Sequence, residues 1–167
     1  MEYGCIGEKL SHSFSKIIHA RLADYNYELC EIPRGELDSF MKKADFKAIN
    51  VTIPYKQAVI PYLYYISDTA KKIGAVNTVV NKNGKLYGYN TDFSGLHALL
   101  VRQRADLNGG KVLILGSGGT SKTAAAVAED LGAKEIYRVS RSGSDGAITY
   151  DEAYKKHGDA TAIINTT

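Results

Sequence analysis

Lys56 and Asp92 each lie in a motif that suits proton transfer. Lys56 ends INVTIPYK, residues 49–56, and Asp92 lies within GYNTDFSG, residues 88–95. A lysine donates a hydrogen bond or a proton without any change in pKa, and it acts as a base only when its surroundings lower its pKa from about 10.4. We therefore predict that Lys56 and Asp92 form an acid/base pair that acts on a hydroxyl group. The alternative is a solvated lysine at a helix start and an aspartate that caps a helix.

The INVTIPYK segment also carries two polar residues on one face of a predicted strand. Asn50 and Thr52 alternate with β-branched apolar residues, and Pro54 then ends the strand. Ligands of α/β proteins bind at the edge of the sheet where parallel strands end. The pattern therefore predicts that Asn50, Thr52 and Lys56 lie close to a ligand.

Strand-like and helical patterns alternate along the chain, which is typical of an α/β protein. Residues 1–104 are predicted to form an α/β substrate domain with a mainly parallel sheet, and Asn83 and Gly84 are predicted to form the turn of a hairpin within it. A polar, glycine-bearing break follows at residues 106–110. Residues 105–167 are predicted to form a partial, Rossmann-like dinucleotide-binding domain, the first βαβαβ half.

A glycine-rich loop joins the first strand and helix of this second domain. In KVLILGSGGTSKT, residues 111–123, glycines allow a sharp turn and the close approach of a pyrophosphate to a helix N-terminus. The predicted cofactor-binding residues are Gly116, Ser117, Gly118, Gly119, Thr120 and Ser121. Residues 116–123 also nearly match the P-loop of a nucleotidase, but Ser121 replaces the glycine before Lys122. A tight turn without a ligand is the third interpretation.

The end of the second strand indicates which dinucleotide binds. This strand ends in RVSRSGSD, residues 138–145, where Arg141 stands between Ser140 and Ser142. An arginine at this position receives the 2′-phosphate of NADP, whereas an acidic residue receives the ribose hydroxyl of NAD. We therefore predict NADP as the cofactor. Arg138 could take the place of Arg141, and a solvated loop arginine is the alternative.

Composition excludes several other classes of function. Charged residues make up 23% of the chain, and the net charge of +3 is spread over scattered basic pairs, so we expect no nucleic-acid partner. The longest mostly apolar stretch, residues 58–66, is too short to cross a membrane. Cys5 and Cys30 read as buried free thiols of a cytoplasmic protein, and the four histidines lack the spacing of a metal site.

Taken together, these motifs resemble the shikimate dehydrogenase family over essentially the whole chain. The resemblance rests on GEKLSHSFSKIIH at residues 7–19, INVTIPYK, GAVNTVV at residues 74–80, GYNTDFSG, the GSGGTS loop, SRS and the final IINTT. It implies reversible NADPH-dependent reduction of 3-dehydroshikimate to shikimate, catalysed by Lys56 and Asp92. The substrate-binding residues that it implies are Ser13, Ser15, Asn50, Thr52 and Asn77, and it places Asn165 and Thr166 near the nicotinamide.

The chain departs from the family pattern at several points. Lys9 and Lys16 stand where prolines are common, and Ser140 stands where an asparagine is usual. Members of the family also continue beyond the position that matches Thr167, with the rest of the nucleotide domain and a returning segment that holds a substrate-contacting glutamine. The alternatives are therefore a quinate/shikimate dehydrogenase of broader specificity and a truncated substrate-binding fragment without turnover.

Overall fold

A computed structural model describes all residues from 1 to 167, and the chain folds into two compact units, Met1–Asn90 and Thr91–Thr167. Helix α4 (Asp92–Arg102) belongs to the second unit, because its Leu96 and Leu100 pack against buried apolar residues there. The predicted domain boundary, between residues 104 and 105, lies after this helix. As the point at which the substrate domain ends and the cofactor domain begins, it stays a prediction.

The first unit is built on a six-stranded sheet with the strand order β2-β1-β3-β5-β6-β4. Strand β1 is parallel to β2 and β3, and β4 is parallel to β6, while β5 runs antiparallel to both of its neighbours. The predicted α/β class is confirmed. The strands are β1 (Tyr3–Gly7), β2 (Tyr27–Glu31), β3 (Ala48–Val51), β4 (Tyr65–Ile66), β5 (Thr78–Lys82) and β6 (Lys85–Tyr89).

The predicted hairpin joins β5 to β6. Asn83 and Gly84 have φ angles of 53° and 82°, the positive values that a tight two-residue hairpin turn requires. Since β5 runs antiparallel to β3, the residue before it, Asn77, lies at the edge of the sheet where β1 and β3 end. The hairpin thus brings a later part of the sequence to the edge that carries the polar residues of β3.

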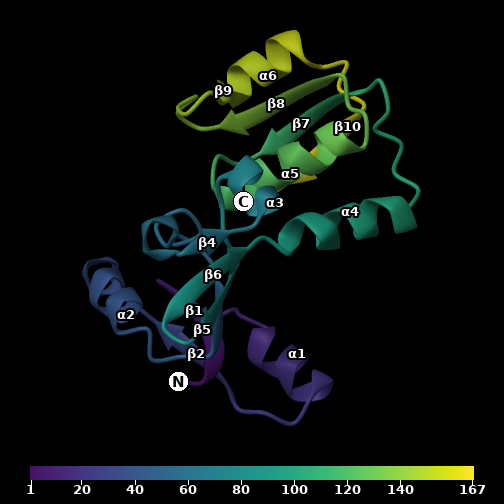
Figure 1. The fold of residues 1–167 in the computed structure, drawn as a ribbon. Helices are drawn as coiled ribbons and strands as arrows, with labels where there is room; N and C mark the ends of the chain where they lie inside the picture. The colour runs from purple at the N-terminus through teal and green to yellow at the C-terminus, as the bar shows by residue number, and fades with distance from the viewer. The chain divides into compact units, whose positions relative to one another are not determined.

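Helices cover the two faces of this sheet. Helices α1 (Ser15–Leu22) and α2 (Leu37–Lys43) lie on opposite sides of it (Figure 1). Alternation along β3 places Ile49 and Val51 in the apolar core with Met41 of α2, whereas Asn50 faces the other side. Single 3₁₀ turns at Arg34–Glu36 and Ile60–Tyr62 and helix α3 (Asp68–Ile73) complete the unit.

Helix α1 ends at Leu22. Ala23 already has extended backbone angles, and the Tyr25 ring packs edge-on against Tyr3 with ring centroids 5.2 Å apart. The packing of this aromatic ring against the sheet therefore takes precedence over another helical turn.

The second unit is a four-stranded parallel sheet with the order β10-β7-β8-β9. Helices α5 and α6 lie on its two faces (Figure 1), where Val112 and Ile114 pack on the α5 side and Leu113 packs with Ala153 of α6. This arrangement confirms the predicted partial Rossmann-like fold. The elements are β7 (Lys111–Leu115), α5 (Gly119–Asp130), β8 (Glu135–Ser140), β9 (Ile148–Thr149), α6 (Tyr150–Lys156) and β10 (Ala162–Asn165).

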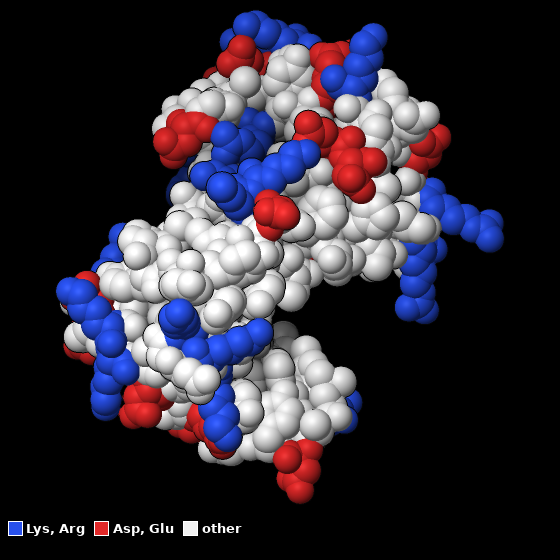
Figure 2. Space-filling model, viewed as in Figure 1, with Lys and Arg blue, Asp and Glu red and all other residues white.

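No helix is both long enough and apolar enough to cross a membrane. On the face drawn in Figure 2, both units carry Lys and Arg side chains interspersed with Asp and Glu. Surface ion pairs include that of Lys42 with Asp38 at 2.9 Å. Such exposed pairs contribute little to stability.

Candidate functional site

The segment after β3 turns back on itself and holds Lys56 against the sheet. The Thr52 N–H donates to the Ile6 carbonyl at 2.9 Å, and the Tyr55 N–H donates to the Thr52 carbonyl at 2.9 Å. The Lys56 carbonyl then accepts the Val76 N–H at 2.7 Å, and the lysine is only 9% exposed. Lys56 is therefore fixed beside the residue that precedes Asn77, in agreement with its predicted position at the sheet edge.

Asn77 is held at the same edge by both neighbouring strands. Its N–H donates to the Tyr89 carbonyl at 3.0 Å, and its carbonyl accepts the Val51 N–H at 2.7 Å. The side-chain oxygen of Asn77 accepts the Thr78 hydroxyl at 3.1 Å, and the residue is buried. Two residues predicted from distant motifs, Lys56 and Asn77, are thus brought together by backbone hydrogen bonds.

The Asn50 side chain lies on the α1 face and is bonded at both ends of its amide. Its oxygen accepts the Tyr27 hydroxyl at 2.6 Å, and its nitrogen donates to the Thr78 hydroxyl at 3.3 Å. Sequence reasoning missed Tyr27 and Thr78. The position of Thr78 directly after Asn77 was a signal, and strand alternation would have placed Tyr27 on the face of Asn50 once the strand order was known.

A cavity of about 410 Å³ opens on this face of the first unit. Its wall includes Tyr27, Asn50 and Thr78, and the imidazole of His19 stacks on the Tyr27 ring with centroids 3.8 Å apart. The remaining lining residues are Tyr3, Tyr25, Ala48 and Ile49. A small polar molecule would therefore find both aromatic surfaces and polar groups here.

The serine-bearing loop after β1 is tied to the same edge. The Glu8 N–H donates to the Ile53 carbonyl at 3.2 Å, which joins the loop to the segment that carries Thr52. Within the loop, the Ser15 N–H donates to the Ser13 hydroxyl at 3.3 Å at the start of α1. Hydroxyl and N–H groups at a helix N-terminus favour an anion, which fits the predicted carboxylate contacts of Ser13 and Ser15.

Burial raises the pKa of two side chains of the first unit, Tyr27 and Cys5. Desolvation strongly raises the pKa of Tyr27, and a hydrogen bond with the Ser15 hydroxyl opposes this rise only in part. Burial likewise raises the pKa of the Cys5 thiol, while the nearby charge of Lys56 acts in the opposite direction. Tyr27 is therefore a neutral hydrogen-bond donor at neutral pH.

Asp92 is the first residue of α4 and belongs to the second unit. An acidic side chain in the first turn of a helix interacts favourably with the helix dipole. The cap position of α4 is Thr91, and no side chain caps the helix, so the alternative of a capping aspartate is wrong; the proton-transfer pairing with Lys56 stays a prediction.

Two glycines of the loop before α5 differ in whether the structure requires them. Gly116 has φ of +125°, and a Cβ atom there would lie 2.5 Å from the Thr166 hydroxyl oxygen. Gly118 has an ordinary φ of −75°, and a Cβ atom there would meet no atom within 4 Å. Neither backbone conformation nor packing therefore requires glycine at position 118. A ligand bound in close contact with the loop would require it.

Ser121 stands where dinucleotide-binding loops have their third glycine, and it stabilises the loop. The Ser121 side chain is fully buried, and its hydroxyl donates to the Gly118 carbonyl at 2.7 Å. A small residue at this position permits close packing of helix and strand, which is the purpose of the third glycine in dinucleotide-binding loops. The predicted contact of Ser121 with a cofactor stays a prediction; its hydroxyl contributes to the shape of the turn.

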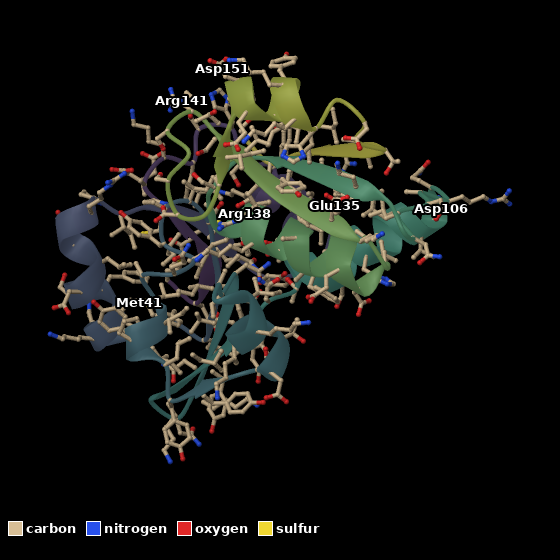
Figure 3. The ribbon with its side chains drawn as sticks, turned by 90° about the horizontal axis from the view of Figure 1, so that it is seen from above. Met41, Asp106, Glu135, Arg138, Arg141 and Asp151 are labelled. Atoms are coloured by element: carbon tan, nitrogen blue, oxygen red, sulfur yellow. The ribbon has the colours of Figure 1, made fainter.

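Arg138 of β8 and Arg141, the first residue after this strand, are labelled in Figure 3, and hydrogen bonds within the following segment make it compact. Ser140 is buried and accepts the Gly143 N–H at 3.1 Å, and the Ser142 and Ser144 hydroxyls lie 2.7 Å apart. Arg138 donates from Nη2 to the Asp145 carbonyl, whereas Arg141 is exposed. Arg138 therefore supports the loop, and Arg141 is available to an anionic ligand.

The end of β10 lies beside the glycine loop. Thr166 donates to the Leu115 carbonyl from both its N–H, at 2.9 Å, and its hydroxyl, at 2.6 Å. The side-chain oxygen of Asn165 accepts the N–H and the hydroxyl of Thr167. The structure thus brings Gly116 and Thr166 together, as expected for residues at the carboxyl ends of adjacent parallel strands.

Comparison with protein families gives a match to the first unit. A family profile described as the shikimate dehydrogenase substrate binding domain matches residues 5–79. This range contains the serine loop, the INVTIPYK segment and Asn77. The chain is also 43% identical to the shikimate dehydrogenase (NADP(+)) of Clostridium beijerinckii, over 99% of this chain and 67% of that relative.

Solved structures give the same result over both units. The crystal structure of shikimate dehydrogenase 1 from Peptoclostridium difficile is similar with a TM-score of 0.89 and 38% identity, over 100% of this chain and 67% of that one. The Thermus thermophilus shikimate 5-dehydrogenase in complex with NADP(H) and shikimate gives 0.82 and 27%, over 100% and 68%. The chain therefore spans about two thirds of the length of these relatives.

The electrostatics of Cys5 lead to a prediction for thiol chemistry. In a Cys30→Ala variant, Cys5 should react with a disulfide reagent at pH 8 at least about 10-fold more slowly than in the unfolded chain, because it is buried and its pKa is raised above the ordinary value of 9.0. The rate should rise as the pH exceeds 9. A stopped-flow absorbance assay measures it, with Cys5→Ala as the control, and equal rates in the folded and unfolded protein would contradict the assignment.

Proposed function

The chain belongs to the shikimate dehydrogenase family, and we propose that it catalyses the reversible, NADPH-dependent reduction of 3-dehydroshikimate to shikimate. The observation that carries the proposal is the position of Lys56, which is buried in the turn that follows β3 and bonded through its carbonyl to the residue before Asn77. These are the residue types and the placement that a proton donor beside a substrate hydroxyl requires.

The substrate carboxylate would bind at the start of α1, and the ring oxygens at the edge of the sheet. Ser13 and Ser15 would receive the carboxylate, since their loop offers hydroxyl and N–H donors at a helix N-terminus. Asn50, Thr52 and Asn77 would contact the ring hydroxyls. The tie between the serine loop and the Ile53 carbonyl supports this division, because it holds both sets of residues in one place.

The proton chemistry falls to Lys56 and Asp92. In the reductive direction NADPH, when bound, supplies the hydride to the carbonyl carbon of the substrate. The ammonium group of Lys56 would donate a hydrogen bond and then a proton to the carbonyl oxygen, which becomes the hydroxyl of shikimate. In the oxidative direction the hydroxyl proton leaves along the same path. Asp92 would orient the lysine and share the proton with it.

The second unit fits an NADP cofactor. Gly118 leaves open space in front of the N-terminus of α5, which suits a pyrophosphate. Exposed Arg141, in the loop that Ser140 and Arg138 shape, suits the 2′-phosphate. Asn165 and Thr166, at the end of the adjacent strand, would lie near the nicotinamide. The absence of a glycine before Lys122 and the similarity to dehydrogenases favour this function over that of a nucleotidase.

Two narrower alternatives remain to be separated by experiment. Steady-state comparison of shikimate with quinate decides between a strict and a broader specificity. Calorimetric titration of the chain with shikimate, alongside the turnover assay, distinguishes an active enzyme from a substrate-binding fragment. We also place the protein in the cytoplasm, because Cys5 and Cys30 are free thiols.

Removal of either proton-handling group should slow turnover. Lys56→Ala and Asp92→Ala should each lower kcat for shikimate oxidation by about 10² or more, because each removes a positioned acid/base group. The assay follows NADPH absorbance. Lys85→Ala and Asp45→Ala are the matched controls, since both residues are exposed, and unchanged kcat in Lys56→Ala and Asp92→Ala would refute the assignment.

Substitution at Gly118 should block the cofactor without harming the fold. Gly118→Val should keep the thermal midpoint within about 2 °C, because its side chain enters open space, and should weaken NADP binding at least about 10-fold by occupying the place of the pyrophosphate. Gly116→Val is the contrast: it should lower stability as well, because of positive φ and the contact with Thr166. Fluorescence titration and calorimetry measure the two effects. Normal NADP affinity in Gly118→Val would argue against the loop as the cofactor site.

Arg141 should determine the preference between the two dinucleotides. Arg141→Ser should raise the Kd of NADP by about 10- to 100-fold, the scale of a charge-assisted hydrogen bond, and leave the Kd of NAD nearly unchanged. Arg102→Ser, at the exposed end of α4, is the matched control. An equal loss of affinity for both cofactors would be incompatible with a 2′-phosphate contact.

A further inference from the structure

The serine loop, residues 8–15, runs from the end of β1 to the first residue of α1. It contains one hydrogen-bonded turn, in which the Ser13 N–H donates to the Leu10 carbonyl at 2.9 Å. The Ser13 hydroxyl oxygen then accepts the Ser15 N–H at 3.3 Å. The positions of both serines therefore depend on what holds Leu10 in place.

Leu10 anchors the serine loop against the end of the sheet. Its side chain is 5% exposed and packs in a cluster with Cys5 and Tyr27. Gly7 makes room for it, because a Cβ atom at position 7 would lie 2.8 Å from Cδ2 of Leu10. A buried residue needs a partner for its backbone N–H, and Leu10 lies outside the strand pairs, whose carbonyls would otherwise accept it. The acceptor must therefore come from elsewhere in the fold.

Glu31, the last residue of β2, supplies this acceptor. Its carboxylate accepts the Leu10 N–H at 2.7 Å, across 21 positions of the sequence. The direction of this bond is fixed, because a backbone N–H donates and a carboxylate accepts. A charged acceptor also makes the bond stronger than one to a neutral oxygen. Three successive bonds, each with a backbone N–H as donor, thus connect Glu31 through Leu10 and Ser13 to Ser15.

Strand β2 holds the serine loop at both ends. Glu31 bonds its first half, and Tyr27 of the same strand is hydrogen-bonded to the Ser15 hydroxyl at its last residue. A further contact joins Arg34 to Glu8, but both of these side chains are exposed, at 72% and 40%, and such ion pairs contribute little. The bond from Leu10 to Glu31 is therefore the tie through which a side chain most directly determines the shape of the turn.

We propose that Glu31 is a positioning residue that holds the serine loop in the conformation that binds the carboxylate of the substrate. The inference rests on the proposed function for the identity of that carboxylate. Residues 8–15 include no proline, so no ring restricts φ in the loop, and its shape depends on hydrogen bonds and packing. Without the Glu31 carboxylate, the turn that carries Ser13 loses a tie to β2. Lys56 lies on another segment and keeps its place.

The test compares Glu31→Ala with Glu31→Gln, which keeps an acceptor oxygen at the same position. Glu31→Ala should raise the calorimetric Kd and the KM of shikimate about 3- to 10-fold, the scale of one hydrogen bond, with kcat changed less than about twofold. The Kd of the methyl ester of shikimate, which lacks the carboxylate charge, should change less than about twofold. Glu31→Gln should bind both ligands within about twofold of wild type.

Glu28→Ala is the matched control, since it removes an exposed carboxylate of the same strand that bonds the neighbouring Asn26 side chain at 3.3 Å. Hydrogen exchange of the Leu10 amide, followed by NMR, gives a readout without substrate. The exchange should be at least about 10-fold faster in Glu31→Ala and close to wild type in Glu31→Gln and Glu28→Ala.

Unchanged exchange of the Leu10 amide in Glu31→Ala, or an equal loss of affinity for shikimate and its methyl ester, would overturn the inference. If the exchange behaves as expected but the wild-type protein neither binds nor oxidises shikimate, the role of Glu31 in the serine loop stands and the proposed function fails.

Discussion

The hydrogen bond between the Val76 N–H and the Lys56 carbonyl, at 2.7 Å, is the constraint on which the first unit's site depends. It joins the turn after β3 to the segment that leads into β5, so that the lysine lies beside Asn77 although 21 residues separate them in the chain. A second hydrogen bond, from the Val51 N–H to the Asn77 carbonyl, joins the end of β3 to the same segment before β5. A parallel strand at this place would begin at the opposite edge of the sheet, and Asn77 would then lie far from Lys56.

Local patterns predicted the elements of the fold well, but the order of the strands depends on contacts that no local pattern contains. The hairpin at Asn83 and Gly84 follows from two residues that tolerate positive φ. The two-residue strands β4 and β9 were not predicted, because two residues carry no periodicity. The antiparallel pairing of β5 with β3 was also not visible, since it joins residues about 30 positions apart.

The candidate site shows the same division between local and long-range information. Lys56 and Asn50 are noticeable in the sequence because polar residues interrupt a β-branched run. Tyr27 lies in an ordinary strand pattern, and only the register of β1 with both of its neighbours brings it to the Asn50 amide. In the second unit, the motif predicted the loop but could not separate Gly116, which the backbone requires, from Gly118, which it does not.

The cost of buried polar groups links the stability of the first unit to its specificity. A buried amide or hydroxyl without a partner destabilises a protein by about 1 to 3 kcal/mol, so the buried Tyr27 and Asn77 side chains need partners, which half-buried Asn50 and Thr78 provide. Each partner in turn restricts the orientation of the next group, because hydroxyls and amides have few ways to satisfy all their bonds. The fold thus supplies partners for these polar groups before any ligand binds, and a change at Tyr27, Asn50 or Thr78 affects its hydrogen-bonded neighbours as well.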